Sequence, residues 1–422
     1  MSDDARVNDV VAWVGLDWAN DCHAVCLQAV HSKQVETCEL QHTPEALHEW
    51  VRQLQARFPN GQVCVALEQS RGAVIHALMT YDFLVMCPIP PASLAAYRKA
   101  FHTSGAKSDP GDAALLLELI VQHRDHFQAW KPDDPQTRSL QLLTQFRRQL
   151  VSQRTRLTNQ VTEQLKNYFP QALDWAGGLD TLQACDFLEK WPTLQAVQKV
   201  SKARLRNFYH RHGCRGTELL DKRLQQIALA QPLTGDSAIV QTHSLMMQAL
   251  VGMLRALIPA IETMDQEIKK LFVQHPDYAV FDSPPGAGPA LAPRLLAAFG
   301  TDRSRFQAAQ QVQQFSGIAP VIESSGKSVW IHRRLACPKF LRQTFHEFAG
   351  QSIHHCAWAK AVYLQQRARG KKHHVAVRAV AYKWIRILFR CWQNRTPYDE
   401  QIYLKALKRR NPQLLPATTY AA

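Results

Sequence analysis

The sequence lacks the features that place proteins in membranes or outside the cell. No uninterrupted apolar run approaches the roughly 20 residues that cross a bilayer, and the N-terminus reads Met1-Ser2-Asp3-Asp4, without a basic and apolar leader. The ten cysteines are scattered singly and form no CxxC pair, which argues against a zinc ribbon or a disulfide framework. We therefore expect a cytoplasmic protein with reduced thiols and no membrane partner.

Acidic residues are scarce, and the scarcity is uneven along the chain. The sequence has 50 Lys and Arg against 35 Asp and Glu, a formal net charge of +15. Between Lys327 and Arg410 there are 19 Lys and Arg against three Asp and Glu. This large surplus of positive charge favours a polyanionic partner. We therefore predict that the chain binds nucleic acid. Five aromatic residues are interleaved with these charges: Trp330, Trp358, Tyr363, Tyr382 and Trp384.

A chain of 422 residues exceeds one ordinary hydrophobic core, so several domains are expected. We predict an α/β domain at 1–130, followed at 131–275 by a helical region with long helices and an insertion at 171–240. A mainly helical domain is expected at 276–395, and a tail at 396–422. The predicted fold class is thus α/β plus α.

The first region predicts a mixed sheet with acidic residues at the ends of its strands. Short apolar runs at 11–17, 23–28, 34–40, 63–67 and 83–87 read as strands, with helices at 43–57 and 71–80. Asp17 ends the first run and Glu68 follows the fourth. Ligand sites in open α/β sheets lie at the carboxyl ends of strands, so these two side chains are candidate site residues.

The stretch Lys107–Ala113 opens a further helix and adds two carboxylates. Asp109 can cap the helix, and Pro110 suits its first turn. Asp109 and Asp112 are three residues apart and share one helix face. A capped helix with an acidic first turn would explain the pair. With Asp17 and Glu68, the pair could instead complete a set of four carboxylates, which is the kind of set that holds two Mg²⁺ ions.

Two long amphipathic helices are predicted at 138–169 and 242–272. Apolar residues near heptad spacing line both, which is compatible with a helical hairpin within one chain or with a coiled coil that joins protomers. Between the two helices, Trp175, Trp191 and Phe208 are expected to be core residues.

The third region combines a glycine turn with a serine segment. Gly286-x-Gly288 lies between two predicted helices and could present backbone N–H groups to a phosphate, as in helix–hairpin–helix modules. A loop containing Ser324 and Ser325 then enters the basic part of the chain. A serine hydroxyl near a metal centre and arginines could attack phosphorus. The basic residues predicted to contact nucleic acid are Lys327, Arg333, Arg334, Lys339 and Arg342.

Together these motifs resemble the DEDD-type transposases, the recombinases of bridge-RNA-guided bacterial insertion elements, which are relatives of the Piv-type invertases. In the first region the matching segments are Val14–Asp17, Leu67-Glu68 and Lys107-x-Asp109-x-x-Asp112-Ala113. In the third region they are Pro285–Pro289, Ser316–Pro320, Ser325-Gly326 and Leu341-Arg342.

The resemblance implies an N-terminal domain with the RuvC-like, RNase H-like fold and a metal-binding tetrad of Asp17, Glu68, Asp109 and Asp112. It implies that Ser325, which directly precedes a glycine, is the nucleophile that forms a covalent phosphoserine link to DNA. It further implies a dimer or tetramer with composite active sites, a structured guide RNA that pairs with donor and target DNA, and action at the bacterial nucleoid.

Two other interpretations stay open at this point. A hydrolytic endonuclease, such as a junction resolvase, would use the same carboxylates with water and would not need Ser325. A non-catalytic nucleic-acid-binding protein would use the acidic residues only as structural groups, so Asp109→Asn would change no strand cutting.

Overall fold

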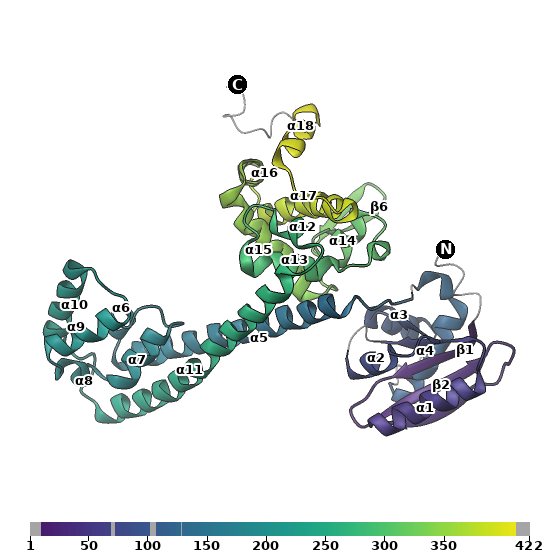
Figure 1. The fold of residues 1–422 in the computed structure, drawn as a ribbon, viewed down its shortest axis with the longest axis horizontal. Coiled ribbons are helices and arrows are strands. Elements are labelled where there is room, and N and C mark those ends of the chain that lie inside the picture. Colours follow the sequence, from purple (N-terminus) through teal and green to yellow (C-terminus); the bar gives the residue numbers. More distant parts are fainter. Residues whose placement is uncertain (1–9, 69–71, 102–106, 128, 411–422) are drawn as a thin grey trace. The chain divides into compact units, whose positions relative to one another are not determined.

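The computed structural model describes residues 10–68, 72–101, 107–127 and 129–410. The chain divides into two compact units, residues 1–133 and 134–422, and each is described by itself (Figure 1). The first unit contains a mixed sheet and the second is mainly helical, so the predicted class of α/β plus α is confirmed at this level.

The first unit is built on a five-stranded sheet with the strand order β3-β2-β1-β4-β5. Strands β1 to β3 form an antiparallel meander, whereas β4 and β5 run parallel to β1. All five predicted strands are present, and the third begins two residues later than expected. Their bounds are β1 (Val10–Asp17), β2 (Cys22–Ala29), β3 (Glu36–Gln41), β4 (Gln62–Leu67) and β5 (Leu84–Pro88).

Helices cover both faces of this sheet because its inner strands are apolar on both sides. Val14 and Leu16 of β1 pack in the same core as α1, whereas Trp13 packs in the core that contains α4. Successive side chains of β1 point to opposite faces of the sheet, so one strand contributes to the cores on both faces. The helices are α1 (Pro44–Arg57), α2 (Ala73–Leu78), α3 (Pro91–Phe101) and α4 (Asp109–Gln122), with a 3-10 turn at Arg124–His126.

A single glycine sets how closely α4 approaches the sheet. A Cβ on Gly15 would overlap the carbonyl oxygen of Ala113 and the amide nitrogen of Leu117, both on α4. The helix backbone therefore lies directly against β1 at the level of Gly15. This contact places the first turn of α4 near the carboxyl end of β1.

In the second unit, α5 (Pro135–Tyr168) and α11 (Ser237–Val273) lie side by side in antiparallel directions (Figure 1). The two helices pack within one chain, as the hairpin interpretation predicts, and whether they also join protomers stays a prediction. Hydrogen bonds fix their register by joining Gln136 to Leu271, Arg147 to Asp265, and Gln164 to His243.

A small helical bundle connects these two helices and has its own core. Trp175, Trp191 and Phe208 are all buried in it, as predicted. The bundle contains α6 (Ala172–Trp175), α7 (Leu182–Lys190), α8 (Leu194–Gln198), α9 (Lys202–Arg211) and α10 (Thr217–Leu229).

The C-terminal helices enclose another core, and two of the interleaved aromatic residues belong to it. Trp358 and Trp384 are fully buried, with ring centroids 4.8 Å apart, so they cannot contact nucleic acid in this conformation. The elements are α12 (Tyr278–Asp282), α13 (Gly288–Phe299), a 3-10 turn (Arg303–Arg305), α14 (Ala309–Phe315), β6 (Val321–Ser325), β7 (Ser328–His332), α15 (Lys339–His355), α16 (Ala357–Ala368), α17 (His373–Asn394) and α18 (Glu400–Arg410).

One helix of the described residues, α11, is long and apolar enough to cross a membrane by length and composition. Its apolar side chains include Leu250 and Ile268, which lie in the two cores of the second unit. A core helix of this kind passes the same test as a membrane span.

We predict that Gly15→Ala destabilises the first unit by about 3 kcal/mol, because the new methyl group must push α4 away from β1. Hydrogen exchange of the amides in β1 and α4 measures the effect. The control is Gly252→Ala on α11, where a Cβ has no neighbour within 4 Å. This control should leave β1 and α4 protection unchanged, and an equal loss in both variants would contradict the prediction.

Candidate active site

Asp17 and Glu68 lie abreast at one edge of the N-terminal sheet. Asp17 is the last residue of β1, and Glu68 directly follows β4. The two strands are parallel neighbours, and Leu16 pairs with Leu67 one residue earlier. The structure therefore brings the two predicted strand-end carboxylates to the same edge.

The first turn of α4 supplies the other two carboxylates, and here one prediction was wrong. The N-cap is Ser108, whose side-chain oxygen accepts a hydrogen bond from the Gly111 amide. Asp109 is the first residue of the helix and is exposed. It therefore does not cap the helix. Asp112 is only 2% exposed. A serine fits the cap because its short hydroxyl reaches the free N–H groups of the first turn.

The charges of the other three carboxylates act on Asp17. The pKa of Asp17 is raised from 3.8 to about 6, first by burial and then by the negative charges of Asp112, Asp109 and Glu68. Lys107 opposes this shift. The α4 contact with β1 thus brings the carboxylates of the α4 first turn within electrostatic range of Asp17.

Arg98 of α3 forms an ion pair with Asp112 inside this site. Its side chain is 18% exposed, and its Nε is buried without a hydrogen-bond partner. Sequence reasoning missed Arg98, because nothing in the local pattern connects it with an aspartate fourteen positions later. The guanidinium supplies positive charge where the carboxylates would otherwise repel one another.

The donor set fits divalent cations in kind. Carboxylate oxygens are the ligands that Mg²⁺ prefers, and the crowded negative charge is what a cation would neutralise. In the part of the chain that the structure describes, no group of three or more His, Cys, Asp or Glu side chains is arranged so that it could hold a metal ion. Asp112 is paired with Arg98 instead.

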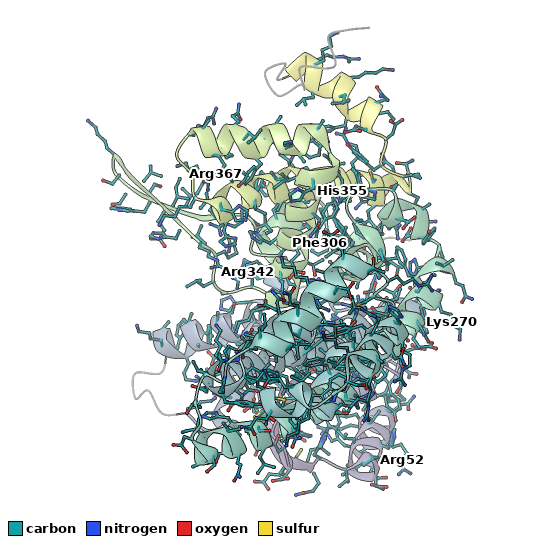
Figure 2. All side chains as sticks on the ribbon, turned by 90° about the vertical axis from the view of Figure 1, so that its left-hand side faces the viewer. Arg52, Lys270, Phe306, Arg342, His355 and Arg367 are labelled. Atoms are coloured by element: carbon teal, nitrogen blue, oxygen red, sulfur yellow. The ribbon has the colours of Figure 1, made fainter. Side chains whose placement is uncertain are left out.

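The predicted serine lies in the second unit, on a β-hairpin rather than in the expected loop. Strands β6 and β7 pair from Val321–His332 to Ser325–Ser328, and the turn between them is Gly326-Lys327. Gly326 has a φ of 57° at the first central position, as in type II′ hairpin turns. Figure 2 shows the hairpin projecting from the helical body of this unit. The signal for it was the β-branched and aromatic run 328–332 after a glycine.

Ser324 and Ser325 point to opposite faces of this hairpin, because successive side chains alternate along a strand. Ser325 shares its face with Glu323 and His332, whose side chains lie 3.4 Å apart. The Ser325 face also carries Val321 and Trp330, whereas Ser324 shares its face with apolar residues. These apolar residues are Ile322, Val329 and Ile331, all more than 60% exposed.

The basic residues predicted to contact nucleic acid surround this hairpin. Lys327 is exposed in its turn, and Arg333 is exposed directly after β7. Arg334 accepts a hydrogen bond on its carbonyl oxygen from Arg342 of α15, at 3.3 Å. Lys339 begins α15 and is exposed.

The Gly286-x-Gly288 turn lies between α12 and α13, as predicted, and both glycines have positive φ. Gly286 has a packing reason to be glycine, because a Cβ there would crowd the α15 backbone at Gln351 and Ser352. Gly288 is exposed and has no such neighbour, so only Gly288 is open to a ligand.

We predict that Arg98→Gln lowers the stability of the metal-free protein by about 3 kcal/mol, since it leaves Asp112 buried without its cation. Added Mg²⁺ should then raise the melting temperature more in this variant than in the wild type, because Arg98 no longer competes for the charge. Calorimetry with EDTA or Mg²⁺ measures both effects. The matched control is Arg52→Gln, which breaks only an exposed pair with Glu49. Equal Mg²⁺ responses in wild type and Arg98→Gln would contradict the expectation.

A second prediction concerns pH. The unfolded Asp17 carboxyl loses its proton near pH 3.8, whereas the folded one keeps it to about pH 6. In EDTA, stability should therefore fall as pH rises between these values, by about 2–3 kcal/mol at most. Asp17→Asn should remove this fall in urea titrations. Identical pH slopes in wild type and Asp17→Asn would assign the dependence to other groups.

Comparison with known proteins places the chain in a family. Residues 14–170 match the profile of DEDD transposases of the IS110 group, and residues 278–364 match that of transposases of the IS116/IS110/IS902 family. A Streptomyces coelicolor protein named as the mini-circle transposase for IS117 is 30% identical over 342 residues, which are 80% of this chain and 82% of the relative.

Two further relatives align over nearly their whole length. The uncharacterised 43.6 kDa protein of insertion element IS110 from Streptomyces coelicolor is 26% identical over 93% of this chain and 97% of the relative. The uncharacterised 42 kDa protein of IS900 from Mycobacterium paratuberculosis is 25% identical over 92% of this chain and 96% of the relative. With both domain profiles matched in order, and with one relative 30% identical over four-fifths of each chain, the chain belongs to the IS110 family of transposases.

Proposed function

We propose that this transposase cuts and rejoins DNA by Mg²⁺-assisted transesterification, with Ser325 as the nucleophile. The observation that carries the proposal is that the charges of Asp112, Asp109 and Glu68 act on Asp17, whose pKa burial and these charges together raise to about 6. Strongly perturbed carboxylates that crowd one another are typical of catalytic sites. An RNase H-like, RuvC-like fold for the first unit is part of this proposal, and the mixed sheet with β1 at its centre supports it.

In this proposal Asp17, Glu68, Asp109 and Asp112 hold two Mg²⁺ ions. When bound, these ions would stabilise the negative charge that builds on the phosphate. Asp109 is exposed and free of capping, so its carboxylate is available. Asp112 must exchange its contact with Arg98 for the cation, and Arg98 then has a free guanidinium beside the site.

Ser325 carries the covalent step. Its Oγ forms a bond to phosphorus while the bond from phosphorus to one strand oxygen breaks; the serine loses a proton and the released strand hydroxyl gains one. In the second step a hydroxyl of a new strand forms the phosphodiester, and Ser325 leaves and regains its proton. The number of phosphoester bonds is conserved, so neither step needs ATP.

The position of Ser325 supports this role. It lies at the end of β6 beside the hairpin turn, exposed, with Lys327 next to it in the turn. A nucleophile on a projecting hairpin can reach a strand that lies outside its own helical body. Ser324 points into the apolar face of the hairpin, which favours Ser325 over Ser324.

The proposal also includes a homo-oligomer with composite active sites and a structured guide RNA. Exposed apolar side chains on the long helices support assembly, since Phe146 is 45% exposed and Met253 is 58% exposed. The family membership and the basic third region support nucleic-acid partners, DNA as donor and target and RNA as guide. Purifying the protein from its host cells and sequencing the bound RNA tests the guide: RNA encoded beside its own gene would support it, and random cellular RNA would remove it.

The central experiment compares Ser325→Ala with Ser324→Ala. We expect Ser325→Ala to abolish both the covalent protein–DNA adduct and recombination, by at least about a thousandfold, because the attacking oxygen is gone. Nucleic-acid binding should stay near the wild-type level. Ser324→Ala should keep both activities, since its side chain lies on the other face.

Denaturing gels that retain covalent adducts measure the outcome directly. Strand cutting that persists in Ser325→Ala without an adduct would favour a hydrolytic endonuclease that uses the same carboxylates. Recombination that persists with an adduct would move the nucleophile to another residue, for which Ser328, across from Ser325, is the next variant.

A further inference from the structure

Two basic pairs face each other across the packed helices α15 and α17. Arg342 and His346 are one turn apart on α15, and His374 and Arg378 are one turn apart on α17. Nε2 of His346 lies 3.2 Å from Nδ1 of His374, and the ring centroids are 5.4 Å apart. We call these four residues, together with two neighbours, the cationic cluster. The two neighbours are Arg333, just after β7, and His373, which is hydrogen-bonded to Tyr363 of α16 at 2.9 Å.

Within the described ranges, no carboxylate forms an ion pair with the three arginines of the cationic cluster. Arg342 donates instead to the carbonyl oxygen of Arg334 at 3.3 Å and to Sγ of Cys337 at 3.4 Å. Glu347 follows His346 on α15 but is bound by Arg294 of α13. The positive charge of the cluster therefore has no acidic partner here.

The charges in the cluster oppose one another. The pKa of Arg378 is lowered by burial and then by Arg333 and Arg342. The pKa of His346 is lowered to about 4 by burial, and then by His374, Arg378, His373 and Arg333. Helices that pack like charges together lose stability unless an anion lies between them. An anion would also make protonation of His346 easier.

We propose that the cationic cluster binds a backbone phosphate of the DNA strand that Ser325 attacks. Arginine forks match the oxygens of a phosphate, and neutral histidines can donate to it. The choice of DNA rests on the proposed function, because β7 of the serine hairpin leads directly into Arg333. Figure 2 shows Arg342 in the helical body from which the hairpin projects.

The distance along β7 separates the cationic cluster from Ser325, so the phosphate in the cluster is not the reacting one. Ser325 pairs with Ser328, and the end of β7 at His332 is four residues further. At about 3.4 Å per residue this is ~14 Å. One strand of B-DNA carries a phosphate about every 3.4 Å along its axis, so a phosphate bound in the cluster is a different one from the phosphate that Ser325 attacks. The cluster would position the strand without touching the reacting atoms.

The test measures binding of the full chain to a short DNA duplex in EDTA, over a range of salt concentrations. Arg378→Gln should weaken binding about fivefold and reduce the slope of log affinity against log salt by about one, as expected for one lost phosphate contact. The control Arg367→Gln removes the same charge from an exposed position on α16. Equal losses in the two variants would overturn the cluster as a site and leave only general charge attraction.

The melting temperature of Arg378→Gln distinguishes a binding role of Arg378 from a structural one. Without DNA, Arg378→Gln should melt at the same temperature as the wild type or higher, because a repelling charge has been removed. A lower melting temperature with unchanged DNA affinity would overturn the proposal. If the weakened binding appears only with an RNA of the same length, the choice of DNA is overturned.

The pH dependence of DNA binding gives an independent test of the cluster. Wild-type affinity for the duplex should rise as the pH falls from 6 to 5, because an anion in the cluster raises the pKa of His346 from its value of about 4. His346→Gln should reduce this rise, and an unchanged pH dependence would count against the cluster. These binding measurements do not depend on the covalent step. A failed serine nucleophile and a failed phosphate site therefore give different results, since only the first abolishes the adduct.

Discussion

The contact between α4 and β1 is the constraint on which the candidate active site depends. Because residue 15 is glycine, the α4 backbone lies against the strand, and the helix begins beside the strand's carboxyl end. Asp112 enters a buried position near Asp17 for this reason. With a larger residue at position 15, the same four acids could be present in the chain and still fail to share one electrostatic site.

Both units concentrate charge of one sign where folding alone would not favour it. In the first unit Arg98 pairs with Asp112, and the pKa of Asp17 is raised to about 6 by burial and then by the charges of the other three carboxylates. In the second unit Arg333, Arg342 and Arg378 approach one another with no acidic partner among the described residues. We propose a different ligand for each sign: cations at the acidic site and phosphates at the basic one.

Sequence patterns predicted the regular elements better than the contacts between them. The five strands and the long helices follow from apolar periodicity, and the strand-end positions of Asp17 and Glu68 follow from the strands. The cap of α4 was assigned to Asp109 because Ser108 and Asp109 are both good caps, and only the backbone dihedral angles distinguish them. Trp358 and Trp384 lie among basic residues in the sequence, but both are fully buried because helix periodicity turns them inward. Arg98 could not be found, because its partner is set by packing between α3 and α4.

The antiparallel pair of α5 and α11 allows the bundle between them to differ in size from one relative to another. The chain enters the small bundle after Tyr168 and leaves it before Ser237, and a hydrogen bond of 2.8 Å from Gln171 to the carbonyl of Gln231 ties entry to exit. An insertion whose ends already meet changes loop-closure entropy little when it grows or shrinks. Natural selection can therefore exchange or resize the bundle at 172–229 as a module, while the register of the two long helices stays the same.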